Sequence, residues 1–285
     1  GYVLIREPVT PGLFVTARAS EVQAGQIVAE AGREIRAAEM SVLASFGYKA
    51  VTVGGQPRVS VFATGSELIG VGEKPAGAQI RNSNSFTIAA YSERAGARAG
   101  VKGVICDSVD ATLQALMRAA DSSDVVITSG GVSVGDYDLV KTALIEMGAE
   151  IFFDQVSIRP GKPTVFARLG ATYFFGLPGN PVSTSVTFNV FVRPALRKMM
   201  GDTSPSLPVL RASASRNIND GSDRRSYLPA RFFVSEGRAM AEPLKWGGSS
   251  DLVAFMQANA MIVVPEDTHH IAEGEIVEVM LLSSV

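Results

Sequence analysis

The chain has 285 residues, of which 46% are hydrophobic, and its formal net charge at pH 7 is −2. This length is sufficient for two packed domains and a fragment of a third, and no long block of lysine or arginine supplies the positive surface of a nucleic-acid-binding protein. The single cysteine, Cys106, excludes an internal disulfide framework and a cysteine-rich metal site. No apolar run approaches the roughly 20 residues of a membrane span. We therefore expect a globular protein of a reducing, cytoplasmic compartment, with no nucleic-acid or membrane partner.

Residues 1–56 combine strand-like pieces with one helical segment. Residues 12–15 and 26–28 have the apolar, glycine-flanked character of strands, and residues 37–46 form a helical pattern that ends at a glycine. The region is too broken for an independent domain, so we interpret it as a partial, mixed N-terminal linker subdomain. It starts with glycine and has no signal peptide, and we expect the chain to begin inside a longer gene product.

Residues 57–203 alternate β-rich runs with helical windows, which is typical of a parallel sheet with helices on both faces. The β-rich runs lie at residues 58–62, 124–128, 150–153, 164–167 and 173–175. The helical windows lie at residues 109–120, after the N-cap candidate Ser108, and at residues 137–147 and 182–199. This pattern predicts a central α/β domain.

A junction rich in proline and serine, residues 202–208, follows this domain. Apolar runs separated by turns, such as residues 260–264 and 275–279, predict an all-β domain over residues 204–285. The pattern fits a small barrel or a sandwich.

Four polar loops each follow a predicted strand, and a sheet of this kind gathers such loops along one edge. The first loop contains Thr64, Gly65 and Glu67. A hydroxyl, a flexible glycine and a carboxylate within so short a segment suit a polar ligand or a metal ion. A capped turn explains them equally well.

The second loop lies between a buried strand and a helix and ends at Asp138. Its glycines, Gly130 and Gly131 among them, permit positive φ angles, so backbone N–H groups can converge on an anion. Asp136 is the expected N-cap of the helix, and Asp138 is then the expected metal or substrate partner. Lys141 lies within reach of the same helix end, or is a solvated lysine of the helix surface.

The third and fourth loops offer groups for an anion. Arg159 and Lys162 flank a rigid Pro-Gly turn, and fixed cations at a sheet edge suit phosphate or a tetrahedral oxyanion, although basic residues are common in turns. In the fourth loop, Asn180 is the expected N-cap and Pro181 lies in the first helical turn. The free N–H groups beyond them form an anion site together with Ser183, or simply initiate the helix.

Two further features receive structural interpretations. His269 and His270 are expected to be solvated, because no cysteine or third histidine accompanies them. Trp246, which precedes a Gly-Gly-Ser-Ser run, is expected at a corner of the β domain rather than in a loop that faces a ligand.

Taken in chain order, the four loops resemble those of the molybdopterin molybdenumtransferase family, to which MoeA and the gephyrin E domain belong. The motifs that carry the resemblance are Thr64–Leu68, Gly130–Asp138, Arg159–Pro163 and Leu177–Ser183. Their combination is far more specific than any one of them, and the similarity extends over essentially the whole chain. The resemblance implies a molybdopterin-binding α/β domain over residues 57–203, a C-terminal β barrel over residues 204–285 and an elongated homodimer.

The resemblance also implies a reaction. Molybdate is inserted at the dithiolene of adenylylated molybdopterin, the pyrophosphate link is hydrolysed and AMP is released with the help of a divalent cation, here expected to be Mg²⁺. Carried onto matching positions, the catalytic and metal-binding acids are Glu67, Asp107 and Asp138, and the catalytic cations are Lys141, Arg159 and Lys162. The contacts to the pterin and its phosphate are Thr64, Gly65, Ser129, Gly130, Gly131, Ser133, Pro178, Gly179, Asn180, Pro181 and Ser183.

The chain departs from the family pattern at a few places. Ser66 and Arg81 stand where aspartate is common, and Arg159 stands where lysine is usual. The N-terminal region that brings an acidic motif in the family is also missing from the sequence. Two alternatives therefore stay open: a molybdopterin adenylyltransferase, which has no need of the β-rich tail, and a non-catalytic molybdopterin carrier or scaffold.

Overall fold

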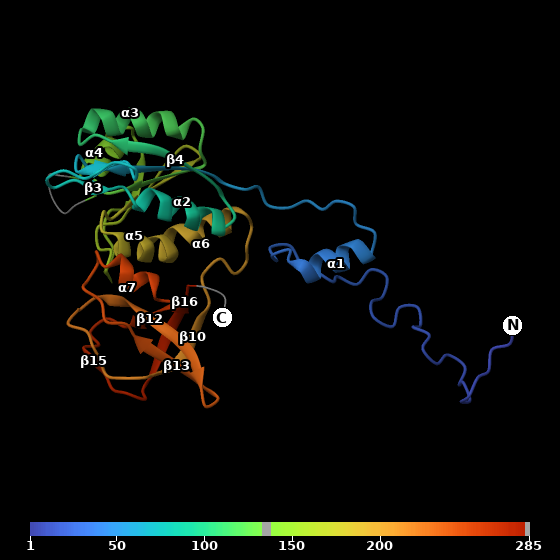
Figure 1. Ribbon diagram of the computed structural model, residues 1–285. Coiled ribbons are helices and arrows are strands. Elements are labelled where there is room, and N and C mark those ends of the chain that lie inside the picture. Colours follow the sequence, from blue (N-terminus) through green and yellow to red (C-terminus); the bar gives the residue numbers. More distant parts are fainter. Residues whose placement is uncertain (133–137, 283–285) are drawn as a thin grey trace. The chain divides into compact units, whose positions relative to one another are not determined.

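The computed structural model of the chain describes residues 1–132 and 138–282 (Figure 1). The chain divides into two units, residues 1–52 and residues 53–285. Within the described residues, no helix combines the length and the apolar character that a membrane crossing needs.

In residues 1–52 the helix predicted at residues 37–46 is confirmed as α1 (Ala37–Ser45). The strand-like pieces predicted at residues 12–15 and 26–28 are wrong, because both segments form turns and irregular backbone. Their large apolar side chains stay exposed, and this unit contains no strand with which either segment could pair. A single short strand has no stability of its own in water.

A six-stranded sheet forms the centre of the α/β region, in the order β4-β1-β5-β9-β8-β6. Its strands are β4 (Arg98–Ile105), β1 (Arg58–Thr64), β5 (Val125–Ser129), β9 (Thr172–Leu177), β8 (Val165–Leu169) and β6 (Glu150–Phe153). The first four run parallel, which confirms the predicted parallel sheet. β8 and β9 are joined by the tight turn at Gly170 and Ala171, and so short a connection joins antiparallel neighbours. β8 and β6 therefore add an antiparallel edge to the parallel sheet.

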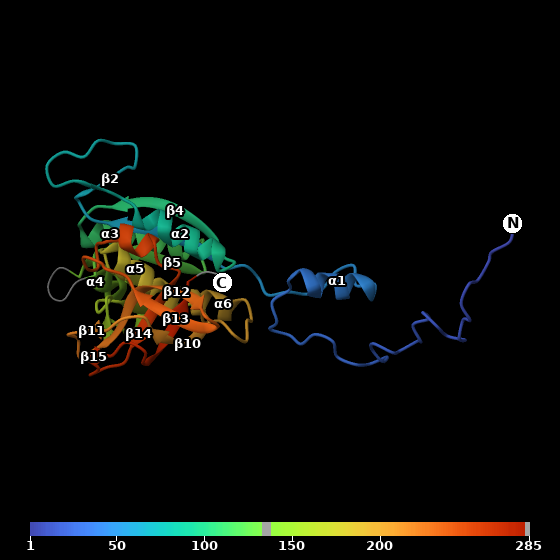
Figure 2. The ribbon, with the colours of Figure 1, turned by 60° about the horizontal axis from the view of Figure 1, so that its bottom comes forward.

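Helices cover both faces of this sheet, as predicted (Figures 1 and 2). One face carries α2 (Asn84–Arg94) and the successive helical segments α5 (Pro181–Thr187), η1 (Phe188–Val192) and α6 (Arg193–Met199). The other face carries α3 (Val109–Ala120) and α4 (Leu139–Glu146). Alternation along β5 produces the two layers, because Val125 and Ile127 pack with the first group and Val126 packs with the second.

The ends of these helices follow the sequence closely. Ser108 caps α3, as predicted, by accepting a hydrogen bond from the Ala111 N–H at 3.4 Å. The long helix predicted at residues 182–199 forms with a π-helical turn, η1, in its middle. Pro194 follows this turn and lacks the N–H group that a regular α-helix would use, which explains the wider turn.

The C-terminal region is a closed barrel, so the choice between a barrel and a sandwich is settled. Its strands are β10 (Val209–Ala214), β12 (Arg225–Ser235), β13 (Arg238–Pro243), β14 (Ala260–Val264) and β16 (Ile276–Leu281). They pair in the order β13-β10-β16-β14-β12, and the pairing of β12 with β13 closes the ring. Smaller elements are α7 (Leu252–Met256), the pair β11 (Ile218–Asn219) and β15 (His270–Ile271), and the pair β2 (Leu68–Ile69) and β3 (Ile80–Arg81).

One strand of the α/β region joins the barrel. β7 (Ile158–Arg159) pairs in parallel with β12, and Ile158 lies in an apolar cluster with Val182 and the barrel residue Met261. Arg159 Nη1 lies 2.6 Å from Oδ1 of Asp220, whose side chain is only 3% exposed. Arg159 therefore connects the α/β region to the barrel.

Removing the Arg159 guanidinium should destabilise the fold. Arg159→Met leaves the buried Asp220 carboxylate without its cation, so we expect the free energy of unfolding in urea to fall by about 2 kcal/mol. Arg168→Met is the matched control, because the Arg168–Glu150 pair is exposed on both sides and should contribute less than about 1 kcal/mol. Adding Asp220→Asn to Arg159→Met should recover part of the loss. Equal losses in the single variant and the control would contradict the assignment.

Candidate functional site

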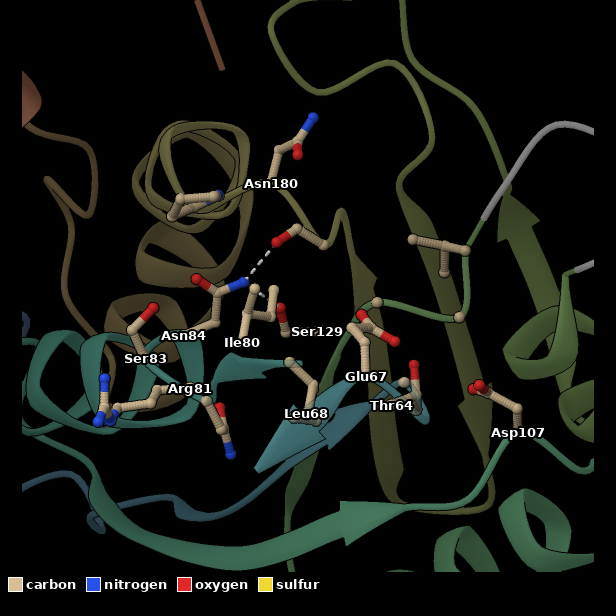
Figure 3. Close-up of a pocket in the computed structure, with 18 of the residues that line it drawn as sticks. Thr64, Glu67, Leu68, Ile80, Arg81, Ser83, Asn84, Asp107, Ser129 and Asn180 are labelled. Atoms are coloured by element: carbon tan, nitrogen blue, oxygen red, sulfur yellow. Dashed lines mark hydrogen bonds between the residues drawn. The ribbon is translucent and has the colours of Figure 1, made fainter. Parts of the chain in front are cut away.

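An open pocket of about 880 Å³ lies at the edge of the sheet where the parallel strands end (Figure 3). β1 ends at Thr64, β5 at Ser129 and β9 at Leu177, and the loops that follow these strands supply much of the pocket wall. The lining residues are Ala63, Thr64, Gly65, Glu67, Leu68, Ile80, Arg81, Asn82, Ser83, Asn84, Asp107, Ser129, Gly130, Gly131, Val132, Leu139, Gly179, Asn180, Pro181 and Ser250. The predicted gathering of loops at one edge therefore holds for the first, second and fourth loops.

Two glycines bring the loop after β5 into contact with the end of β1. Gly130 and Gly131 have φ angles of 86° and 66°, in the left-handed region. A Cβ atom would lie 2.5 Å from the Thr64 carbonyl oxygen at Gly130, and 2.6 Å from Thr64 Oγ1 at Gly131. Thr64 Oγ1 is buried without a hydrogen-bond partner among the described residues. The pocket wall thus needs glycine at both positions and holds an unsatisfied hydroxyl.

Glu67 and Asp107 are the carboxylates that line the pocket, and Figure 3 shows both of them near Thr64. Asp107 Oδ2 accepts a hydrogen bond from the Ser66 N–H at 2.8 Å, which ties the loop after β4 to the loop after β1. Both carboxylates are exposed, so a ligand or a cation can reach them. Mg²⁺ in proteins is held by one or two carboxylates together with substrate phosphates and water, and this pair fits that pattern.

Asn84, at the start of α2, connects three parts of the wall (Figure 3). Its Nδ2 donates to Ser129 Oγ at 2.8 Å and to the Gly179 carbonyl at 2.7 Å, and it lies 3.3 Å from Thr184 Oγ1. Ser129 Oγ in turn donates to the Pro178 carbonyl at 3.3 Å. Asn84 therefore fixes the loop after β9 relative to β5, and the Ser129 hydroxyl serves the same network.

Asp138 and Lys141 lie at the start of α4, outside the pocket lining. Asp138 caps the helix, because its Oδ1 accepts a hydrogen bond from the Lys141 N–H at 2.9 Å. The cap was predicted at Asp136, which lies outside the described residues. Burial raises the pKa of Asp138, while a hydrogen bond to Asp154 raises the pKa of Lys141 and lowers that of Asp154. The Lys141 ammonium is thus paired with Asp154, outside the pocket lining.

The structure brings together ten of the predicted site residues and leaves others outside the pocket lining. Those that line it are Thr64, Gly65, Glu67, Asp107, Ser129, Gly130, Gly131, Gly179, Asn180 and Pro181, and those that do not are Asp138, Lys141, Arg159, Lys162, Pro178 and Ser183. Ser133 lies outside the described residues. Among the residues that are described, no three histidine, cysteine, aspartate or glutamate side chains converge as a metal site, so Asp138 does not complete a carboxylate triad with Glu67 and Asp107.

Sequence reasoning missed two polar contributions to the pocket. Residues 81–84 line it, although only Arg81 was noted, and the signal was a polar run immediately before a helix. Ser250 lines it as well, so the loop after Trp246 faces the site and the interpretation as a mere barrel corner is corrected. Asn180 stands at the N-cap position, but its side chain donates to Ser249 Oγ at 2.9 Å instead of capping the helix.

Comparison with known families agrees with this architecture. Residues 60–198 match the family described as "Probable molybdopterin binding domain", and residues 211–282 match the "MoeA C-terminal region (domain IV)". These two matches assign the chain to a class of molybdopterin-binding proteins in which a barrel follows the binding domain.

The curated relatives narrow this class. The chain is 32% identical over 280 residues to a molybdopterin molybdenumtransferase of Staphylococcus aureus, covering 98% of this chain and 67% of the relative. It is 34% identical over 270 residues to the enzyme of the same name from Staphylococcus epidermidis, covering 95% of this chain and 64% of the relative. The chain belongs to the molybdopterin molybdenumtransferase family, and it spans about two thirds of the length of these relatives.

Solved structures support the same assignment. A molybdopterin biosynthesis MoeA protein from Pyrococcus horikosii superposes with a TM-score of 0.77 at 28% identity, covering 90% of this chain and 62% of that chain. A molybdenum cofactor biosynthesis protein from Pyrococcus furiosus superposes with a TM-score of 0.70 at 25% identity, covering 92% and 81%. The α/β region and the barrel are therefore arranged as in proteins of molybdenum cofactor biosynthesis.

Two variants of Asn84 should show how much its hydrogen bonds, as distinct from its volume, contribute to the stability of the fold. Asn84→Ala removes the donors to Ser129 and Gly179 and should lower the free energy of unfolding by about 1 kcal/mol. Asn84→Asp keeps the shape but places carboxylate oxygens against the Gly179 carbonyl, so the loss should be about 2 kcal/mol or more at pH 7. Urea unfolding measures both. An Asp variant as stable as wild type would show that the network does not fix this wall.

The pH dependence of stability should report the burial of Asp138. A raised pKa in the folded state means that stability is lost as pH rises through that pKa, because the charged form is the one that burial penalises. Asp138→Asn keeps the helix cap without the charge, so it should be at least as stable as wild type at pH 7. Asp138→Ala loses the cap and should be about 1 kcal/mol less stable. Urea unfolding at pH 4 and pH 7 tests this, and equal instability of both variants at pH 7 contradicts it.

Proposed function

We propose that this protein inserts molybdate into adenylylated molybdopterin and releases AMP, assisted by a divalent cation such as Mg²⁺. The observation that carries the proposal is the pocket itself, in which Glu67 and Asp107 stand beside the glycine loop of residues 130–131 in a chain of the molybdopterin molybdenumtransferase family. A pocket of about 880 Å³ has room for a pterin joined to a nucleotide.

The glycine loop and the loop after β9 are the proposed contacts of the pterin and its phosphate. Gly130 and Gly131 present backbone without side chains, so a ligand can approach the loop closely. The Gly130 N–H already donates to the Leu177 carbonyl at 3.0 Å, so the Gly131 N–H is the amide of this pair that we propose for the ligand. Gly179 and Asn180 face the same pocket and are held in place by Asn84 and Ser249. The unsatisfied Thr64 hydroxyl supplies a further hydrogen-bonding group for the ligand.

Glu67 and Asp107 would hold the divalent cation, with phosphate oxygens of the substrate completing its ligands. When bound, the cation would neutralise charge that develops on the phosphates during hydrolysis of the pyrophosphate link. The chain's own part is to position Asp107, whose carboxylate the Ser66 N–H holds against the loop that carries Glu67. Four further residues belong to the proposed site by resemblance to the family: Asp138, Lys141, Arg159 and Lys162. We propose that they act from outside the pocket lining.

Assembly, compartment and domain limits complete the proposal. A homodimer in the cytoplasm is the expected form, as in the resemblance drawn from the sequence. The proposed limits are residues 1–56 for the linker subdomain, residues 57–203 for the molybdopterin-binding domain and residues 204–285 for the barrel.

A second candidate is a molybdopterin carrier without catalytic activity. The observation that favours it is the pairing of the expected catalytic cations, since Lys141 binds Asp154 and Arg159 binds Asp220. Neither cation lines the pocket. A pocket that holds the pterin without those cations would bind and release the ligand unchanged.

A turnover assay with adenylylated molybdopterin, molybdate and Mg²⁺ distinguishes these functions. The transferase releases AMP and yields molybdenum-loaded cofactor, whereas consumption of ATP indicates an adenylyltransferase, and tight binding with neither reaction indicates the carrier. Glu67→Gln should lower turnover by about 100-fold or more, because it removes a proposed carboxylate ligand of the divalent cation. Glu150→Gln, on the edge strand β6 outside the pocket lining, is the control and should retain full activity.

The same assay tests Asp138 in catalysis. Asp138→Asn should abolish molybdenum insertion although the variant folds with its helix capped, so a loss of activity cannot be attributed to unfolding. Full activity of this variant would limit Asp138 to its role as the cap of α4.

A further inference from the structure

We propose that Arg81 binds a tetrahedral oxyanion in the pocket, either the phosphate of the nucleotide or free molybdate. The inference rests on the proposed function for the identity of the ligand, while the position of the anion follows from the pocket's own charges. Within the described residues, Arg81 is the single lysine or arginine that lines the pocket.

The other expected cations are placed elsewhere. Lys141 pairs with Asp154, and Arg159 pairs with the buried Asp220. Lys162 is exposed and does not line the pocket. A doubly charged anion in this pocket therefore meets Arg81 as the only described full positive charge on the wall, and a charge-assisted hydrogen bond is about twice as strong as a neutral one.

The local structure holds Arg81 in place and leaves its guanidinium available. Arg81 ends β3, whose pairing with β2 is completed by the bonds from the Ile80 N–H to the Glu67 carbonyl at 2.9 Å and from the Asn82 N–H to the Ile69 carbonyl at 3.0 Å. Arg81 Nε donates to the Val71 carbonyl at 3.0 Å. No described carboxylate pairs with Arg81, so both Nη groups can face two oxygens of one anion in the fork geometry that suits phosphate.

The charges also give the pocket a direction. Figure 3 shows Arg81 on one side of the pocket and Asp107 on the opposite side, with Glu67 between them. A ligand is thus oriented with one oxyanion toward Arg81, while a cation held by the two carboxylates would meet other phosphate oxygens of the same ligand. Without that cation, like-charge repulsion disfavours an oxyanion beside Glu67 and Asp107 and leaves Arg81 as its preferred position.

Calorimetric titration of the full chain with AMP, adenosine and sodium molybdate tests this inference. If the anion is the nucleotide phosphate, Arg81→Gln should weaken AMP binding about tenfold and leave adenosine unchanged. If the anion is molybdate, the loss should fall on molybdate and not on AMP. Arg81→Lys should bind between wild type and Arg81→Gln, because lysine keeps the charge but loses the fork.

Arg118→Gln is the control, because Arg118 is an exposed arginine on α3 outside the pocket lining and its loss should change none of the three affinities. The inference is overturned if Arg81→Gln binds both oxyanions as tightly as wild type does. It is also overturned if the variant loses affinity equally for AMP and adenosine, or if the wild-type chain binds neither oxyanion. If the wild-type chain fails to insert molybdenum, but Arg81→Gln still weakens oxyanion binding selectively, the proposed function alone is overturned.

Discussion

The pocket depends on how closely the end of β5 can approach the end of β1. Gly130 and Gly131 meet Thr64 at distances that no Cβ atom could tolerate, so backbone takes the place that side chains would otherwise occupy. Asn84 then fixes the loop after β9 to the same point through Ser129. The parallel sheet supplies the shared edge, and these contacts join three separate loops into one wall of the pocket.

The expected cations and the expected acids of the site differ in whether they are paired. Glu67 and Asp107 stay exposed and available, whereas Lys141 and Arg159 are each paired with an aspartate outside the pocket lining. Arg159 joins β7 to the barrel by pairing with Asp220, which is buried and would destabilise the fold without a cation beside it. The pocket is thus acidic except at Arg81, which gives a charged ligand one preferred orientation.

The sequence predicted the parts of this structure that depend on local pattern. The alternation of buried strands and helices gave the sheet, and the Ser108 cap was predicted correctly because cap and helix are neighbours in the chain. The partner of Arg159 lies 61 residues away in the barrel, and no local signal could reveal it. The helix cap was predicted at Asp136 instead of Asp138, because both positions hold aspartate and aspartate is a favoured N-cap residue at either one.

The barrel is part of the site rather than an appended domain. Ser250 lines the pocket, and the Ser249 carbonyl accepts a hydrogen bond from the Val182 N–H at 2.9 Å, where the helix after β9 begins. The apolar cluster of Ile158, Val182 and Met261 continues this contact into both cores. A protein that needed only the α/β domain would have to cover this cluster in another way. The shared core therefore explains why the helix that carries Asn180 and Pro181 is positioned by both folded regions at once.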